Sequence, residues 1–147
     1  MPDFILTPIT ALGHATPEVD IIGPWTITER ADVALASLAV RRGRLGDLQA
    51  AAAGAGVLLP AAGAAAQGTP YSAFWMTPEM WMVEAPFASH EDIRAHLPPA
   101  FGDAASITEQ TDAWVRFDLA GADLPRLFER LCNFDLAKAP QGRPPAP

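Results

Sequence analysis

The sequence predicts an α+β fold, in which a split β-α-β (ferredoxin-like) antiparallel sheet carries its helices on one face. Three observations lead to this prediction. Strand-like and helix-like segments follow one another in the order β-α-β-β-α-β. Half of the 147 residues are apolar, and the length suffices for one domain with a core. Right-handed crossovers make the split arrangement a natural packing for this order.

Prolines, alanines and glycines indicate the structure of the first third of the chain. Residues 1–24 contain four prolines and no clear period, so we expect an extended N-terminal arm. Residues 32–40, DVALASLAV, are typical of a buried strand, although their alanines leave a helix open. Residues 44–55, RLGDLQAAAAGA, favour a short helix, which Gly54 and Gly56 are placed to end.

The middle of the chain predicts a hairpin and a second helix. Residues 71–76 and 80–85 are strand candidates on either side of Thr77-Pro78-Glu79. Ser89 is placed to cap a helix with Asp92 at its third position, and the Pro98-Pro99 pair would stop it.

The last elements predict a strand and one further helix. A strand lies within residues 106–119, and a helix with leucines at helical spacing opens at Ala122 or Asp123. We therefore expect three parts: an arm over 1–24, the β-α-β-β-α-β module over 25–121, and a helix with a Pro-rich tail over 122–147.

A short internal echo suggests that this last helix starts a second module. Ile27-Thr28-Glu29 and Asp32 recur as Ile107-Thr108-Glu109 and Asp112, at an offset of 80 positions. Chance and duplication both explain so short an identity. Under duplication the second module is incomplete here, either because the chain is truncated or because partner subunits cover what is missing.

Composition argues against several classes of function. The formal net charge of −7 disfavours nucleic acid, whose phosphates need clustered lysines and arginines. Charged residues make up 18%, below the roughly 25% usual in soluble domains, which suggests that another chain covers part of the surface. A single cysteine fits a reducing cytoplasm, and no stretch reaches the roughly 20 apolar residues of a membrane-spanning helix.

No catalytic set stands out. His90 and His96 lie six positions apart, so they do not form a metal pair on one helix face, and His14 lies in the arm. Cys132 near a helix C-terminus lacks the setting of a reactive thiolate. We therefore expect a binding or structural component, with no catalytic, cofactor-binding or metal-binding residue in this chain.

Several segments together resemble a known family. Residues 33–43, VALASLAVRRG, are similar to the early strand of the gamma subunit of heterotetrameric sarcosine oxidase. Residues 75–83, WMTPEMWMV, resemble its Trp-x-Gly-Pro-Asp/Glu-x-Trp-Leu segment, with Thr77 where the family usually has glycine. Residues 106–136 resemble its later strand and helix, and the similarity covers roughly residues 26–136.

The resemblance implies a fold related to the folate-binding module of the aminomethyltransferase, and a complex that oxidatively demethylates sarcosine to glycine. The complex uses FAD, FMN, NAD and tetrahydrofolate, held by the large subunits. We accordingly expect a non-catalytic, cytoplasmic gamma subunit whose partners are the large flavin and folate subunits, with neither nucleic acid nor membrane as partner. The isolated chain would be prone to self-association.

Two hypotheses concern the segment FWMTPEMWMVEAP. In the first, Met80, Met82 and Glu84 form a candidate partner-contact face on the side of the sheet left bare by the helices, while Trp81, Val83 and Ala85 face the core. In the alternative, a stand-alone folate-binding or one-carbon transfer domain, three tryptophans stack a pterin and nearby carboxylates accept its N–H groups. The residues concerned are Trp75, Trp81 and Trp114, with Glu79, Glu109 or Asp112.

Overall fold

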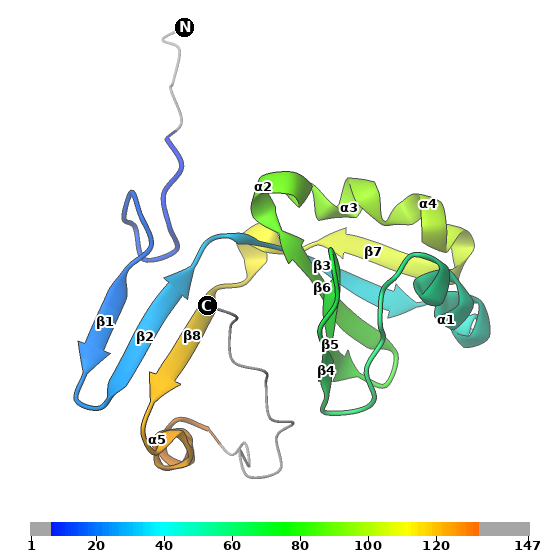
Figure 1. The fold of residues 1–147 in the computed structure, drawn as a ribbon. Helices are drawn as coiled ribbons and strands as arrows, with labels where there is room; N and C mark the ends of the chain where they lie inside the picture. The colour runs from blue at the N-terminus through cyan, green and yellow to red at the C-terminus, as the bar shows by residue number, and fades with distance from the viewer. Residues whose placement is uncertain (1–6, 133–147) are drawn as a thin grey trace, which may run out of the picture. The chain divides into compact units, whose positions relative to one another are not determined.

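The computed structural model describes residues 7–132, which form two compact units (Figure 1). Within these residues, unit 1 comprises 7–31 and 115–132, and unit 2 comprises Asp32–Trp114. The expected division placed residues 25–121 in one module. The structure differs because the strand that begins at Trp25 pairs with the strand that begins at Arg116, outside the sheet of unit 2. The Pro-rich tail lies outside the described residues.

Unit 2 confirms the ferredoxin-like fold class. Its sheet has the order β4-β5-β6-β3-β7, and every neighbouring pair is antiparallel. Apart from the short edge strand β4, this is the split β-α-β arrangement, with β6 inserted between β3 and β5. The elements are β3 (Val33–Val40), α1 (Leu45–Gly54), β4 (Ala65–Ala66), β5 (Ser72–Thr77), β6 (Met80–Pro86) and β7 (Ala105–Glu109).

Three short helices stand where one was expected between β6 and β7. They are α2 (Phe87–His90), α3 (Ile93–His96) and α4 (Pro98–Phe101), followed by the 3-10 turn Gly102–Ala104. Asp92 interrupts the helix because its carboxylate accepts the Ala95 N–H at 3.1 Å and caps α3. Helix α3 ends at His96, before the Pro98-Pro99 pair, as predicted; Pro98 then begins α4, since the first turn of a helix tolerates proline.

The core of unit 2 lies between the sheet and its helices. Strand alternation turns Trp81, Val83 and Ala85 of β6 toward the helices, as the sequence predicted. The same cluster contains buried residues of β3, α1, α3 and α4, so these helices cover one face of the sheet. They are Ala34, Ala36, Leu38, Leu48, Ala52, Ile93 and Phe101.

Unit 1 is a three-stranded antiparallel sheet with one helix. The strands β1 (Val19–Ile22), β2 (Trp25–Arg30) and β8 (Arg116–Gly121) have the order β1-β2-β8, and α5 (Leu124–Leu131) follows β8. The expected extended arm thus contains a strand. Gly23, at φ 59°, and Pro24 form the loop of a tight hairpin, a glycine signal that the proline-based prediction missed.

The part of unit 1 that the structure describes has no apolar core. Of its described residues only Glu29 is buried. The exposed fraction is 76% for Ile21, 49% for Val115 and 38% for Phe117. An isolated two-layer unit needs buried apolar side chains to offset the entropy of folding. Unit 1 therefore presents an apolar surface that needs a cover.

The two copies of the sequence echo lie in two equivalent pairs of strands, β2 with β8 and β7 with β3. Ile27 of β2 lies opposite Leu119 of β8, and Ile107 of β7 lies opposite Leu38 of β3. Ile27 and Ile107 differ by 80 positions, whereas Leu38 and Leu119 differ by 81. One additional residue, between Glu109 and β8, therefore makes the two ladders equivalent. This equivalence favours internal duplication over chance. The predicted strand within 106–119 is correspondingly split into β7 and β8 by the 3-10 turn Thr111–Ala113.

Candidate functional site

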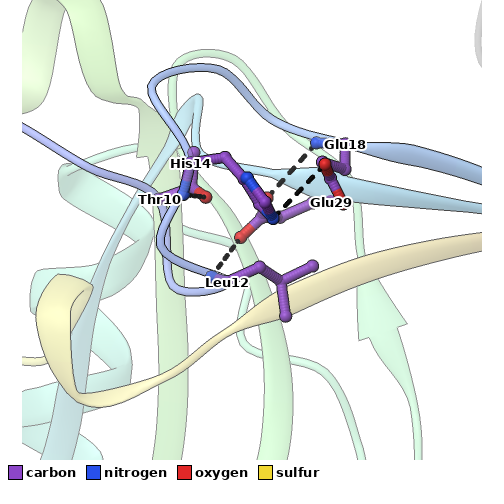
Figure 2. Close-up of polar contacts among 5 residues, drawn as sticks. All are labelled: Thr10, Leu12, His14, Glu18 and Glu29. Carbon is purple, nitrogen blue, oxygen red and sulfur yellow. Dashed lines mark hydrogen bonds and ion pairs between the residues drawn. The ribbon is translucent and has the colours of Figure 1, made fainter.

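The buried carboxylate of Glu29 fixes a loop onto β2 (Figure 2). One oxygen, Oε1, accepts the backbone N–H of Leu12 at 3.0 Å. The other, Oε2, accepts the N–H of Glu18 at 3.3 Å, and the Glu29 N–H donates to the Glu18 carbonyl at 2.9 Å. Because backbone donors occupy both oxygens, this carboxylate acts as a clamp.

The surroundings of Glu29 favour its ionised form. Burial desolvates the carboxylate and raises its pKa, but hydrogen bonds from Leu12, Thr10 and Glu18, together with nearby His14, lower the pKa by more. The net pKa of Glu29 is below its ordinary value. The loop is tied further by the Thr10 hydroxyl, which accepts the His14 N–H at 3.3 Å, and by the ion pair between His14 Nε2 and Glu18 Oε1 at 3.3 Å.

Glu109, the counterpart of Glu29 in the echo, has the same role in unit 2. Its Oε2 accepts the Arg94 N–H at 3.2 Å, and its Oε1 accepts the Thr111 N–H at 3.2 Å and contacts the Thr111 hydroxyl. That hydroxyl also accepts the Leu35 N–H at 3.0 Å. Both repeated glutamates therefore hold backbone segments against a strand end, which gives the Thr-Glu echo a structural explanation.

Two histidines form an imidazole pair in unit 2. The rings of His90 and His96 lie 4.7 Å apart, and Tyr71 packs edge-on to His90 at 5.3 Å. From their spacing, the two histidines were not expected to share one helix face. They belong to different helices, His90 to α2 and His96 to α3, and the break between these helices brings the two rings together. Burial and then the charge of His96 lower the pKa of His90. Among residues 7–132, no group of three or more His, Cys, Asp or Glu side chains is placed to hold a metal ion.

A hollow of about 410 Å³ lies where β3 ends beside the β5–β6 turn. Its charged lining residues, Arg41, Arg42 and Glu79, are all exposed. Arg41 is already engaged by Asp103 and by the Ser106 hydroxyl, each at 3.3 Å. With its charges solvated and partly paired, the hollow has no buried polar group to select a ligand.

The three tryptophans proposed to stack a pterin do not form a cage. Trp75 and Trp81 lie directly opposite each other across β5 and β6, on the face that packs against the helices. Trp81 is only 7% exposed, and its indole N–H donates to the Pro60 carbonyl at 2.9 Å. Trp114 is exposed beyond the 3-10 turn. Since the face of Trp81 is covered, the stand-alone folate-binding hypothesis loses its central stacking residue.

The predicted contact residues lie opposite the helix-covered face, but that face is not bare at Met82. Met82 lies between Ser37 of β3 and Phe74 of β5 and is 2% exposed. Strands on both sides of β6 supply these neighbours, which the sequence did not specify. Met80, at the hairpin end, and Glu84 are half-buried. Their contact with a partner stays a prediction, whereas the expected accessibility of Met82 is wrong.

Comparison with known proteins shows a likeness to a solved structure. No protein-family model matches the sequence, and no curated protein matches it. The fold is similar to that of a chain of the heterotetrameric sarcosine oxidase from Corynebacterium sp. U-96, solved in complex with pyrrole 2-carboxylate. The TM-score is 0.59 at 23% identity, and the match covers 76% of this chain. This chain spans 57% of the length of the chain that it matches. At this identity the likeness establishes the fold.

Two smaller observations complete the comparison with the sequence predictions. Cys132 is exposed just after α5, as a free thiol. Across the described part of the chain, no helix is both long and apolar enough to cross a membrane.

Proposed function

We propose that this chain is a non-catalytic, gamma-type subunit of a sarcosine-oxidase-type complex, which oxidatively demethylates sarcosine to glycine. The observation that carries the proposal is the fold shared with a chain of a heterotetrameric sarcosine oxidase, over 76% of this chain. The exposed apolar side chains of unit 1 give independent support, because a subunit of a permanent complex is expected to leave such a surface for its partners.

The physical role would be to dock unit 1 against a large subunit. Burying a Val, Ile or Phe side chain contributes about 1.5–3 kcal/mol. Val19, Ile21 and Ile22 on β1 are each more than half exposed. The strand register places Val19 and Ile21 on the face of Asp118, and Ile22 on the opposite face with the exposed Phe117, so both faces of this sheet carry exposed apolar side chains. A stable interface of about 1,600 Å² in total would therefore find its apolar centre in unit 1.

In this proposal the chain itself holds no cofactor. The large subunits carry FAD, FMN, NAD and tetrahydrofolate, and the complex resides in the cytoplasm. This chain contributes the contact surface and the rigidity of its ferredoxin-like unit.

Co-purification tests the proposal. A tagged form of the chain is coexpressed with the genes adjacent to its own, and the purified material is examined for flavin absorbance and sarcosine-dependent oxidation. We expect a yellow, active complex that contains the chain in fixed stoichiometry. A yellow complex that assembles fully while the chain elutes alone would exclude the subunit role.

A matched pair of variants localises the interface. Ile21→Lys alters a 76% exposed residue of unit 1, and Leu58→Lys alters a 57% exposed residue of unit 2. Both substitutions replace an exposed apolar side chain, so neither should unfold the chain. We expect only Ile21→Lys to lower recovery of the complex; equal recovery of both variants would remove unit 1 from the interface.

A further inference from the structure

A break in the helical segment after β6 brings two imidazole rings together. Helix α2 ends at His90 and α3 ends at His96, and Asp92 caps α3 between them. The ring centroids of the two histidines lie 4.7 Å apart, and the ring planes are tilted by 50°. Side chains six positions apart on one continuous helix do not face each other, so this contact depends on the break.

The separation of the two rings suits the binding of a single metal ion. An imidazole nitrogen binds Zn²⁺ at about 2.0–2.1 Å, so two imidazoles on one ion have ring centroids roughly 4.5–5.2 Å apart at ligand angles of about 90–110°. The observed 4.7 Å lies inside this range. The tilt matters as well, because nitrogen lone pairs lie in the ring planes and those of two parallel rings cannot point at one ion.

Ser89 determines which nitrogen of His90 is free to bind. Its Oγ donates to the Pro86 carbonyl at 3.3 Å and lies 2.9 Å from His90 Nδ1. A hydroxyl has one proton to donate, so towards the imidazole Oγ accepts, and we assign the hydrogen of the neutral ring to Nδ1. The lone pair is then on Nε2. Histidines that bind metals typically donate their second N–H in this way, which fixes the tautomer and the orientation of the ring.

Tyr71 supports the same ring from another side. It lies just before β5 and packs edge-on to His90, with the ring centroids 5.3 Å apart. Tyr71 and His90 are both half-buried, whereas His96 is exposed. His90 is therefore held in place before an ion arrives, which lowers the entropic cost of binding, and the pair stays open to solvent at His96.

The ligand set indicates the class of ion. Within the described part of the chain, no third His, Cys, Asp or Glu side chain joins the pair. Zn²⁺ is usually four-coordinate, so water would occupy the remaining positions. Imidazole nitrogen suits Zn²⁺, Ni²⁺ and Cu²⁺, whereas Mg²⁺ and Ca²⁺ prefer oxygen ligands. An exchangeable transition-metal ion therefore matches this pair.

We propose that His90 and His96 together bind one divalent transition-metal ion, with His90 contributing Nε2 and water completing the coordination. The ion links α2 to α3 across the break at Asp92, and we assign it no step of the oxidation. The site goes beyond the proposed function and does not depend on it. It replaces the expectation that this chain has no metal-binding residue.

Isothermal titration calorimetry of the full chain with zinc chloride tests the site. The chain is freed of metal with a chelator, carries no polyhistidine tag and has the substitution Cys132→Ser, because an exposed thiol binds zinc itself. We expect one zinc ion per chain and no binding of Mg²⁺. His90→Gln and His96→Gln should each weaken zinc binding by about tenfold or more. His14→Gln removes a histidine of unit 1 and should leave the affinity unchanged.

A further variant tests the orientation of the ring. Ser89→Ala keeps both histidines but removes the hydrogen-bond partner of His90 Nδ1, and it should weaken zinc binding by about tenfold. Cu²⁺ gives a second readout, because this paramagnetic ion broadens the NMR signals of nearby groups. It should broaden the signals of Tyr71 and of the α2 and α3 amides, and leave those of His14 sharp.

Several results would overturn the proposal. They are the absence of saturable zinc binding, an affinity unchanged in His90→Gln or in His96→Gln, and one zinc ion per two chains, which would place the ion between two copies. An affinity unchanged in Ser89→Ala would overturn the assignment of Nε2. His96 is exposed, so His96→Gln keeps the test valid even if His90→Gln lowers the melting temperature of the metal-free chain. Failure of zinc binding leaves the subunit role standing, since co-purification decides that role.

Discussion

Replacement of Trp81 by alanine is the most direct test of the core of unit 2. The indole is 7% exposed and lies between Leu38 of β3 and Trp75 of β5. It also donates its N–H to the Pro60 carbonyl at 2.9 Å, which ties the connector after α1 to the sheet. Trp81→Ala therefore removes apolar packing and a buried hydrogen bond at once.

The two contributions can be estimated separately. Truncation of a buried Trp to Ala costs about 3–5 kcal/mol, which includes the cavity that remains. Trp81→Phe retains an aromatic ring but leaves the Pro60 carbonyl without its donor, a loss of about 1–3 kcal/mol. Since domains are stable by about 5–15 kcal/mol, Trp81→Ala should remove a large part of the free energy of unfolding.

Urea unfolding followed by far-UV circular dichroism measures these losses without relying on tryptophan fluorescence. Trp114→Ala is the matched control, because Trp114 is 49% exposed and its loss should change stability by about 0.5 kcal/mol or less. The expected order of destabilisation is Trp81→Ala, then Trp81→Phe, then Trp114→Ala. Equal losses for Trp81→Ala and Trp114→Ala would refute the assignment of Trp81 to the core.

Three further predictions concern single residues. The pKa of Glu29 is lower in the folded chain than in the unfolded chain. Its ionised carboxylate therefore stabilises the fold fully above the ordinary glutamate pKa of about 4.3, and this stabilisation is lost as the pH falls through the folded pKa. The difference in melting temperature between wild type and Glu29→Gln should accordingly disappear in acid, and a difference that stays constant with pH would contradict the clamp. Met82→Glu should lower stability by about 3–5 kcal/mol in urea unfolding because it buries an unpaired charge. Met80→Glu, at a half-buried position, should cost far less, and equal losses would contradict the burial pattern. Gly121→Ala should destabilise unit 1 by about 1–3 kcal/mol, because φ is 137° and an added Cβ would lie 2.2 Å from the Pro24 oxygen. Amide hydrogen-exchange rates in β2 that stay the same as in the wild type would refute this prediction.

Local patterns predicted most of unit 2. The alternation of Trp81 and Val83 with Met80 and Met82 identified the hairpin and the face that packs against the helices. The alanine-rich run after Arg44 identified α1. These features depend on neighbours a few positions apart, which the sequence displays directly, so the two strands of the hairpin were predicted to within one residue and the face of β6 that packs against the helices was predicted correctly.

Features that depend on distant residues were not predictable in the same way. Met82 is buried with Phe74 and Ser37 beside it on two different strands, and no local period of the sequence reports that arrangement. The clamp formed by Glu29 uses donors at Leu12 and Glu18, in a segment interpreted as an extended arm. The recurrence of Thr-Glu was the available signal for it, but an echo of sequence does not say what the glutamates bind.

The apolar correspondence between β3 and β8 shows why the repeat was hard to interpret from sequence alone. At the offset of 80 that aligns the Thr-Glu pairs, Ala36 and Leu38 correspond to Arg116 and Asp118, and the strands look unrelated. One residue inserted after Glu109 shifts the correspondence to Phe117 and Leu119, and apolar residues then match apolar residues. Only the pairing partners of β2 and β7 locate that insertion. The same register gives the exposure of Phe117 its meaning, because it places this side chain at a position that is core in the other half of the repeat. An apolar residue at such a position favours a state in which other apolar side chains cover it, because burial removes its surface from water.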